Sequence, residues 1–178
     1  GAVLYRTGTC KASELGSLFK YMPITAICTI IGAVSLSAFP LFSGFVTKTL
    51  ILSALGKEGL VFAYFMLLFS SAGVLIYSGI RVPFFAFFAN ESKIKSKEAP
   101  LNMIIAMISA SILCILLGIL PSYFYNILPH QIHYQPYDFS HIVGQIQLLG
   151  FSALAFICLW HFKIYPSEIN STILNSDW

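Results

Sequence analysis

Long apolar stretches alternate with short polar segments along the whole chain. A helix needs about 20 consecutive apolar residues to cross about 30 Å of hydrocarbon at 1.5 Å per residue. Runs of about that length, or slightly shorter, recur at 24–39, 39–55, 60–80, 101–120 and 143–161. The pattern predicts an all-α, polytopic transmembrane helical bundle with about five spans, one of them interrupted.

Polar segments divide this predicted bundle. We expect residues 1–178 to form a single transmembrane region. Its parts are an interfacial connector at 1–21, spans at 22–88 that include an interrupted helix at 39–55, a polar loop at 89–100, two last spans at 101–162 around a polar loop at 121–142, and a polar tail at 163–178. The connector's helical apolar spacing is typical of a segment lying along the membrane surface, although an ordinary polar connector explains it equally well.

Composition supports a membrane protein and excludes several other classes. The chain is 57% hydrophobic and only 10% charged, whereas soluble domains carry about 25% charged residues. Its net charge of +3 comes from lysines between the apolar runs, without a basic patch, so no nucleic-acid partner is expected. The four cysteines show no C-x-x-C spacing and are expected to act as small hydrophobic residues.

The basic residues leave the orientation open. Lys and Arg favour the cytoplasmic side of a membrane. If all five runs cross, the basic residues divide almost evenly between the two sides. If the 39–55 segment dips in and returns, nearly all of them fall on one side, opposite Lys57. Interrupted helices that do cross are common in transporters, so both topologies remain open at this point.

The 39–55 segment places a proline, a glycine and a lysine inside an apolar run. Pro40 has no amide hydrogen and Gly44 leaves helical geometry at little cost, which predicts a helix interruption at these two residues. Ser43 and Thr47 supply hydroxyls one turn apart, which predicts a hydrated path beside the interruption. An ionisable residue in such a run, here Lys48, is a functional hypothesis by default.

Lys48 is predicted to be a proton relay. Desolvation and the free amides at the start of a half-helix both disfavour its ammonium form. Every glutamate of the chain falls in or near a polar segment, so no acidic partner is expected beside it inside the membrane. The alternative is that Lys48 lies near a helix end and extends its ammonium to the lipid headgroups.

Other chemistry has little support. His130 and His133 could share a helical face, but no third ligand stands at suitable spacing, so no metal site is expected. The chain has no nucleotide-binding loop, no paired intramembrane carboxylates and no G-x-S-x-G motif. We therefore expect no catalytic residues, no cofactor and no enzymatic activity of its own.

Two motifs carry a family resemblance. A K-x-M-P motif from Lys20 to Pro23 precedes a helix rich in small residues, and P-x-x-S-G-F-x-x-K follows from Pro40 to Lys48. This arrangement resembles the second half of the antiporter-like membrane subunits shared by respiratory complex I, membrane-bound hydrogenases and Mrp-type monovalent cation/proton antiporters. The opening GAVLYRTGT is similar to the end of the family's preceding helix, and the closing LNSDW to the tail of several Mrp-type D-like members.

The resemblance implies a fold of about fourteen helices built from two inverted five-helix repeats, each with one interrupted helix. Residues 39–55 would be the interrupted helix of the second repeat, crossing the membrane, with Lys48 on the exit half-channel. Lys93 to Lys97 would then lie in the cytoplasm. The family's first repeat has no counterpart in these residues, so we expect a piece of a longer subunit or the product of a split gene.

The favoured function is that of the C-terminal portion of the D subunit of an Mrp-type Na⁺/H⁺ antiporter. It would sit in the lipid bilayer of a bacterial inner membrane, bind other subunits of the assembly, and move protons and monovalent cations with Lys48 as relay. One alternative is an antiporter-like subunit of complex I or a hydrogenase, which pumps protons coupled to quinone reduction or electron transfer. A second alternative is a structural helical fragment without transport of its own.

Overall fold

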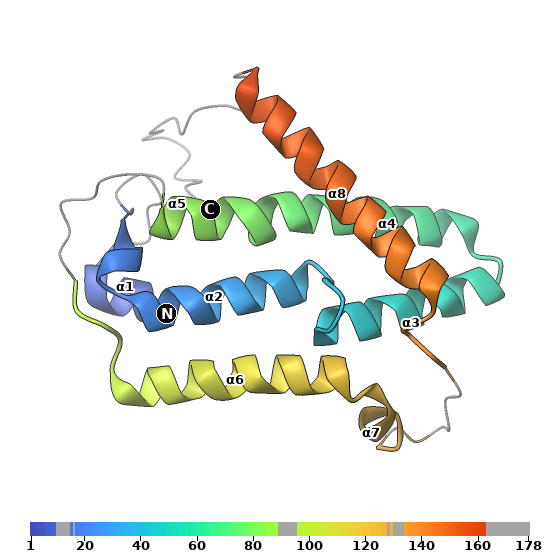
Figure 1. Ribbon diagram of the computed structural model, residues 1–178, viewed down its shortest axis with the longest axis horizontal. Helices are drawn as coiled ribbons and strands as arrows, with labels where there is room; N and C mark the ends of the chain where they lie inside the picture. The colour runs from blue at the N-terminus through green and yellow to red at the C-terminus, as the bar shows by residue number, and fades with distance from the viewer. Residues whose placement is uncertain (10–14, 16, 89–95, 128, 130–133, 163–178) are drawn as a thin grey trace.

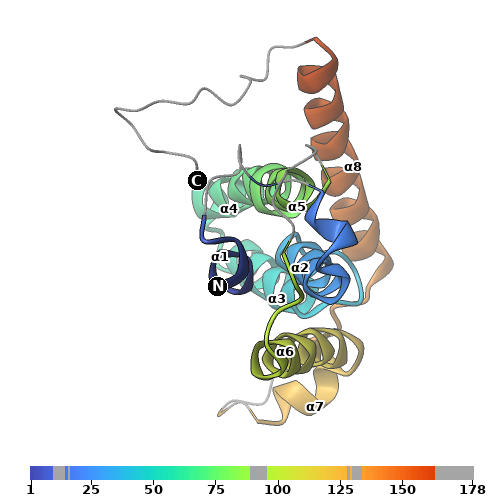
Figure 2. The same cartoon turned by 90° about the vertical axis from the view of Figure 1, so that its left-hand side faces the viewer.

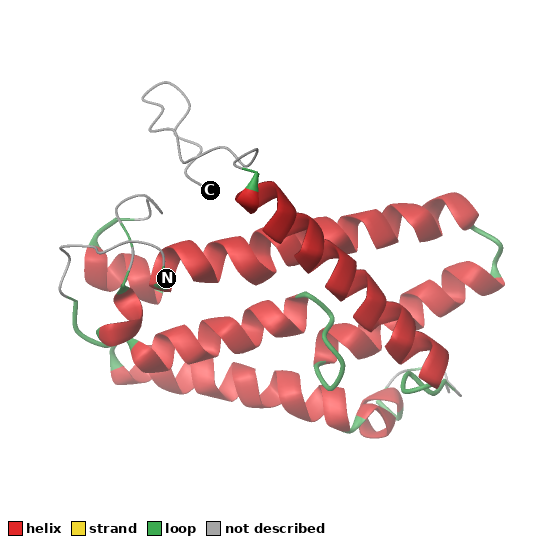
Figure 3. Ribbon diagram, turned by 45° about the horizontal axis from the view of Figure 1, so that its top comes forward, coloured by secondary structure: helices red, strands yellow, loops and turns green. Residues whose placement is uncertain are grey.

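The computed structural model describes all residues except 10–14, 16, 89–95, 128, 130–133 and 163–178. All regular elements in these described ranges are helical (Figure 3), which confirms the all-α prediction. They are α1 (Ala2–Thr7), a 3₁₀ turn (Leu18–Lys20), α2 (Pro23–Leu36), α3 (Ser43–Lys57), α4 (Val61–Val74), a π-helical segment (Leu75–Arg81), α5 (Val82–Phe87), α6 (Leu101–Ile119), α7 (Pro121–Tyr125) and α8 (Phe139–His161).

α2 and α3 lie end to end and together form one interrupted helix (Figure 1). α2 has 14 residues, about 21 Å at 1.5 Å per residue, which is too short to cross about 30 Å of hydrocarbon. α3 adds 15 residues, and the pair reaches about 43 Å. The structure thus corrects the prediction of a complete first span at 24–39. The interruption lies at residues 37–42, hereafter the break, and the interrupted helix extends over 23–57 instead of 39–55.

Three helices in the described residues are long and apolar enough to cross a membrane: Val61–Phe84, Leu101–Ile119 and Phe139–Leu159. These candidate spans coincide with the apolar runs at 60–80, 101–120 and 143–161, with shifted ends. α4, the π-helical segment and α5 run on continuously as one rod, the α4–α5 rod. The interrupted helix lies between this rod and α6, while α8 crosses the bundle obliquely (Figures 1 and 2).

The π-helical segment of the α4–α5 rod packs against α2 just before the break. Pro83 follows this segment. A proline has no amide hydrogen to donate to the carbonyl one turn earlier, and its ring clashes with that carbonyl, so a wider local turn relieves the clash. A Cβ added to Gly79 in this segment would overlap the hydroxyl of Ser37, the first residue of the break. The missing side chain at Gly79 therefore lets the rod approach the break closely.

Two further glycines meet backbone atoms at the interruption. A Cβ on Gly44, in the first turn of α3, would overlap the carbonyl oxygen of Ser35 in α2. A Cβ on Gly118, near the end of α6, would overlap the carbonyl oxygen of Leu41 in the break. Glycine at both positions allows three chain segments to meet at one point, which no larger residue permits without a backbone shift.

The segment before α8 completes the packing around α3. Phe45 of α3 stacks on Tyr137 with ring centroids 5.5 Å apart, and Ala38, Val46 and Tyr125 are buried in the same cluster. Asp138 directly precedes α8 and accepts a 2.5 Å hydrogen bond from the Ser140 hydroxyl, and this bond holds the pKa of its carboxyl below the usual value. These contacts set the position from which α8 enters the bundle.

Substituting the close-approach glycines should destabilise the fold. Gly44→Ala and Gly118→Ala force backbone segments apart, and overpacking of this kind costs about 1–3 kcal/mol. Thermal unfolding of the purified protein in detergent should show lower midpoints for both variants. Gly150→Ala in α8 is the matched control, because a Cβ there has no neighbour within 4 Å. Equal midpoints for all three variants would contradict these close approaches.

Candidate functional site

The break folds as a tight turn between the two half-helices. The amide of Phe42 donates to the carbonyl of Phe39 at 3.3 Å, with Pro40 and Leu41 at the two central positions. Leu41 has φ 75°, as the third residue of a type II turn requires, and Ala38 has φ 58°. Neither residue is glycine, so both hold a backbone conformation that costs about 1–3 kcal/mol and needs support from the surroundings.

Side chains from distant parts of the chain supply that support. The buried amide of Gln145 in α8 donates from Nε2 to the carbonyl of Ser37 at 3.3 Å. The Tyr137 hydroxyl donates to the carbonyl of Gly118, a residue that lies against the backbone of Leu41 in the break. Both residues therefore stabilise backbone groups that the break and the end of α6 leave outside regular helix.

The two half-helices also bond to each other across the break. The hydroxyls of Ser35 in α2 and Ser43 in α3 are 3.1 Å apart and share a hydrogen bond. The Thr47 hydroxyl, one turn further along α3, donates to the carbonyls of Ser43 and Gly44 at 3.2 and 3.3 Å. Each hydroxyl keeps lone pairs that can accept hydrogen bonds from water.

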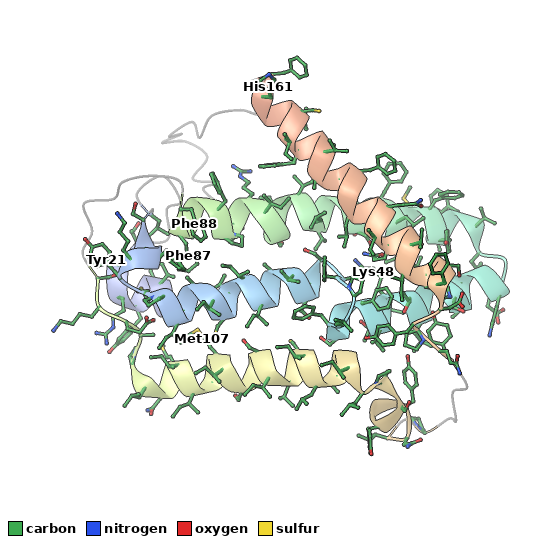
Figure 4. The ribbon with its side chains drawn as sticks, in the orientation of Figure 1. Tyr21, Lys48, Phe87, Phe88, Met107 and His161 are labelled. Carbon is green, nitrogen blue, oxygen red and sulfur yellow. The ribbon has the colours of Figure 1, made fainter. Side chains whose placement is uncertain are left out.

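Lys48 lies beside this group and borders a cavity of about 430 Å³. Its side chain is half-buried, near the junction of α2 and α3 (Figure 4). Lys48 is nine residues before Lys57, which places it about 14 Å along the axis from the end of α3. The cavity walls come from four helices and include Gly32, Ser35, Leu36, Ser43, Gly44, Thr47, Ile51, Leu67 and Cys114.

Among the described residues, Lys48 has no hydrogen-bond or ion-pair partner. A half-buried ammonium without a counter-charge is poorly stabilised, so its charge must be balanced by water in the cavity or by release of the proton. The site can therefore take up and release a proton, which is the chemistry that a relay requires. The hydroxyls of Ser35, Ser43 and Thr47 can hold water molecules in the same cavity.

The structure brings all five predicted site residues into one region. Pro40 lies in the break, Ser43 opens α3, and Gly44, Thr47 and Lys48 follow along one face of α3. Gly44 lies within the helix and contributes a close approach, while the turn itself belongs to residues 37–42.

Several residues that support the break were not predicted from the sequence. Gln145 is a polar residue in an apolar span, which is a visible signal, but its partner is 108 positions away. Gly79 and Gly118 carry no local signal, because many helical glycines of this chain contact nothing. His130 and His133 lie outside the described residues. Within the described ranges, no three His, Cys, Asp or Glu side chains gather as metal ligands do.

Comparisons with known proteins agree with the motif resemblance. Residues 1–76 match the family described as NADH:quinone oxidoreductase/Mrp antiporter, TM. The chain is 30% identical over 135 residues to the A subunit of the Na(+)/H(+) antiporter of Alkalihalophilus pseudofirmus, covering 68% of this chain and 17% of that protein. These similarities support membership in the antiporter-like membrane family that Mrp antiporters and complex I share.

Two other relatives represent both branches of that family. Identity is 34% over 100 residues with the D subunit of the Na(+)/H(+) antiporter of Bacillus subtilis, covering 56% of this chain and 19% of that protein. The chain is 33% identical over 113 residues to NADH-ubiquinone oxidoreductase chain 5 of Cryptococcus neoformans, which covers 59% of this chain and 17% of that protein. The chain thus spans less than a fifth of the length of these relatives.

Removing the Tyr137 hydroxyl should weaken the break. Tyr137→Phe keeps the ring stacked on Phe45 but leaves the carbonyl of Gly118 without its donor, and such a buried unpaired group costs about 1–3 kcal/mol. The thermal unfolding midpoint should fall. Tyr123→Phe is the control, because Tyr123 is 72% exposed and its midpoint should stay unchanged. Matching midpoints for the two variants would show that the hydroxyl does not support the break.

Proposed function

We propose that this chain, a member of the antiporter-like family, is part of a subunit of a multisubunit Mrp-type monovalent cation/proton antiporter, with Lys48 as its proton relay. The observation that carries the proposal is the setting of Lys48, half-buried beside a broken helix, in a cavity of about 430 Å³, without a partner among the described residues. Broken helices that line a cavity with an ionisable residue are the usual binding sites of secondary transporters.

The chemistry follows from these surroundings. A neutral Lys48 accepts a proton from cavity water, and the resulting ammonium is poorly stabilised because no carboxylate faces it in the described part of the chain. Its proton therefore passes readily to the next water. The hydroxyls of Ser35, Ser43 and Thr47 hold and orient that water, and the break keeps them close to the ammonium.

The distribution of basic residues supports an orientation. With α2 and α3 as one crossing, successive polar segments alternate between the two ends of the bundle. Of the ten Lys and Arg residues, Lys48 lies within a helix and Lys57 lies at the α3 end. Counting crossings along the sequence assigns the other eight to the opposite side of the membrane: Arg6, Lys11, Lys20, Arg81, Lys93, Lys95, Lys97 and Lys163. The positive-inside rule then assigns the N-terminal end of α2 to the cytoplasm.

The proposal assigns the chain to an antiporter assembly in preference to complex I. Relatives named as the A and D subunits of Na(+)/H(+) antiporters both match, the first over more of this chain than the second. Relatives named NADH-ubiquinone oxidoreductase chain 5 favour a second candidate, a proton-pumping subunit of complex I. Lys48 would have the same role in both, since each function moves protons through this part of the fold.

Replacing Lys48 should greatly slow transport. The test uses vesicles that contain the complete assembly, with cation exchange driven by a pH gradient. Lys48→Ala should slow exchange roughly 100-fold, the scale on which a positioned proton-transfer group acts. Lys48→Arg should also be slow, because a guanidinium does not release its proton in proteins. Lys57→Ala, at the exposed end of α3, should exchange normally. Normal exchange by Lys48→Ala would remove Lys48 from the mechanism.

Purification should separate the two candidate assemblies. A tagged copy of the complete subunit, extracted in mild detergent, should bring down the other membrane subunits of an antiporter, and exchange in vesicles should depend on an added monovalent cation. Recovery of quinone-reducing subunits, together with proton pumping that needs no such cation, would overturn the antiporter assignment in favour of complex I.

A further inference from the structure

The hydroxyl-bearing residues of α2 gather on one side of the helix. Together with Gly32, the residues Thr25, Thr29 and Ser35 form a stripe at spacings of three or four positions, so they share one face of a helix that is otherwise apolar. The stripe extends about 15 Å from Thr25 to Ser35 at 1.5 Å per residue. It begins at the N-terminus of α2 and ends beside the cavity of Lys48.

A second cavity continues the first along this stripe. It has about 200 Å³ and lies between α2 and α6, lined by Cys28, Thr29, Gly32, Met107, Ala110, Ser111 and Cys114. Gly32 and Cys114 border both cavities, so the two adjoin. We call the two adjoining cavities the α2–α6 seam. Figure 4 shows two of its lining residues, Met107 on α6 and Lys48 near the α2–α3 junction.

A carboxylate lies at the N-terminal end of α2. Glu98, in the segment before α6, accepts a 2.6 Å hydrogen bond from the Thr25 hydroxyl and 3.3 Å bonds from the amides of Ile24 and Thr25. Arg6 of α1 donates to the backbone carbonyl of Glu98 at 2.8 Å, which ties this segment to α1. The next hydroxyl inward, on Thr29, donates to the carbonyl of Thr25 at 2.8 Å.

Glu98 caps the N-terminus of α2 from a distant segment, whereas an ordinary cap comes from the residue directly before the helix. A Ser, Thr, Asp or Asn directly before the helix would satisfy the same amides. Here the carboxylate comes from 73 residues away and binds Thr25. The carbonyl of Thr25 accepts the hydrogen bond from Thr29, a residue that lines the smaller cavity. A carboxylate and an amine at the two ends of one path are the pair of groups that can pass a proton between them.

We propose that the α2–α6 seam is a hydrated proton path between Lys48 and Glu98, and that Glu98 exchanges this proton with the aqueous phase at the N-terminal end of α2. In the outgoing step the Lys48 ammonium releases a proton to cavity water and becomes neutral. The proton passes along water held by the seam hydroxyls, and the Glu98 carboxylate accepts it before releasing it to bulk water. This inference rests on the proposed role of Lys48 as a relay.

Native cysteines test the hydration of the seam without any transport assay. In the complete assembly, variants that keep only Cys28 or only Cys114 are treated with a charged, water-soluble methanethiosulfonate, which reacts with ionised thiols in contact with water. Both cysteines should react about tenfold faster than Leu113→Cys in a cysteine-free background, since Leu113 lies next to Cys114 on α6 but outside the seam. Equal or slower reaction at Cys28 and Cys114 would overturn the path.

The same labelling separates this proposal from the proposed function. A Lys48→Ala variant should lose transport and still show fast labelling of Cys114. Slow labelling in an assembly whose transport depends on Lys48 would refute the seam and leave the relay intact. Fast labelling in an assembly that transports normally without Lys48 would refute the relay, and with it the Glu98 path.

The role of Glu98 has its own test. Glu98→Gln keeps a hydrogen-bond acceptor for Thr25 but cannot carry the proton, so exchange should slow by roughly tenfold. Azide, a small weak acid that can deliver protons, should restore part of the rate in this variant and none in Lys48→Ala. Glu58→Gln, in the exposed turn after α3, is the control and should exchange normally. Normal exchange by Glu98→Gln, or a loss that azide does not restore, would reduce Glu98 to a helix cap.

Discussion

Backbone amides and carbonyls released from a helix inside a membrane must find hydrogen-bond partners within the protein, and the break at 37–42 is where this chain meets that requirement. A turn at Phe39–Phe42 closes part of the gap, but it holds Leu41 and Ala38 in left-handed conformations. Gln145 and Tyr137 supply further partners from α8 and the segment before it. The packing of α8 and of the segment before it brings the side chains of Gln145 and Tyr137 to the break.

The close approaches around the break shape the cavity beside it. Gly44 brings α3 against Ser35, and Gly118 brings α6 against Leu41, so three helices meet with little side-chain volume between them. This packing leaves space along the adjoining α2–α6 seam, where small residues face one another. Lys48 lines that space without a partner among the described residues, and a poorly stabilised charge of this kind is suited to the proton exchange that we propose for it.

A single interrupted crossing also resolves a conflict in the charge pattern. Counting α2 and α3 as separate crossings divides the basic residues almost evenly, whereas counting them as one crossing would assign eight of them to one side of the membrane and Lys57 to the other. The N-terminal end of α2, where Glu98 binds, then coincides with the basic side of the bundle. The proposed relay lies on this interrupted helix, and its proposed carboxylate partner binds the N-terminal end of the same helix.

Much of this protein is readable from local sequence, because hydropathy and helix breakers act over one helix length. The apolar runs alone determined the membrane class and three long spans, and Lys48 with Pro40 and Gly44 marked the region of the site. Only the tertiary structure showed that α2 and α3 lie end to end, that Gln145 reaches Ser37, and that Glu98 reaches Thr25. These pairs lie 108 and 73 residues apart, and no local pattern encodes which distant polar group will satisfy a given backbone atom or helix end.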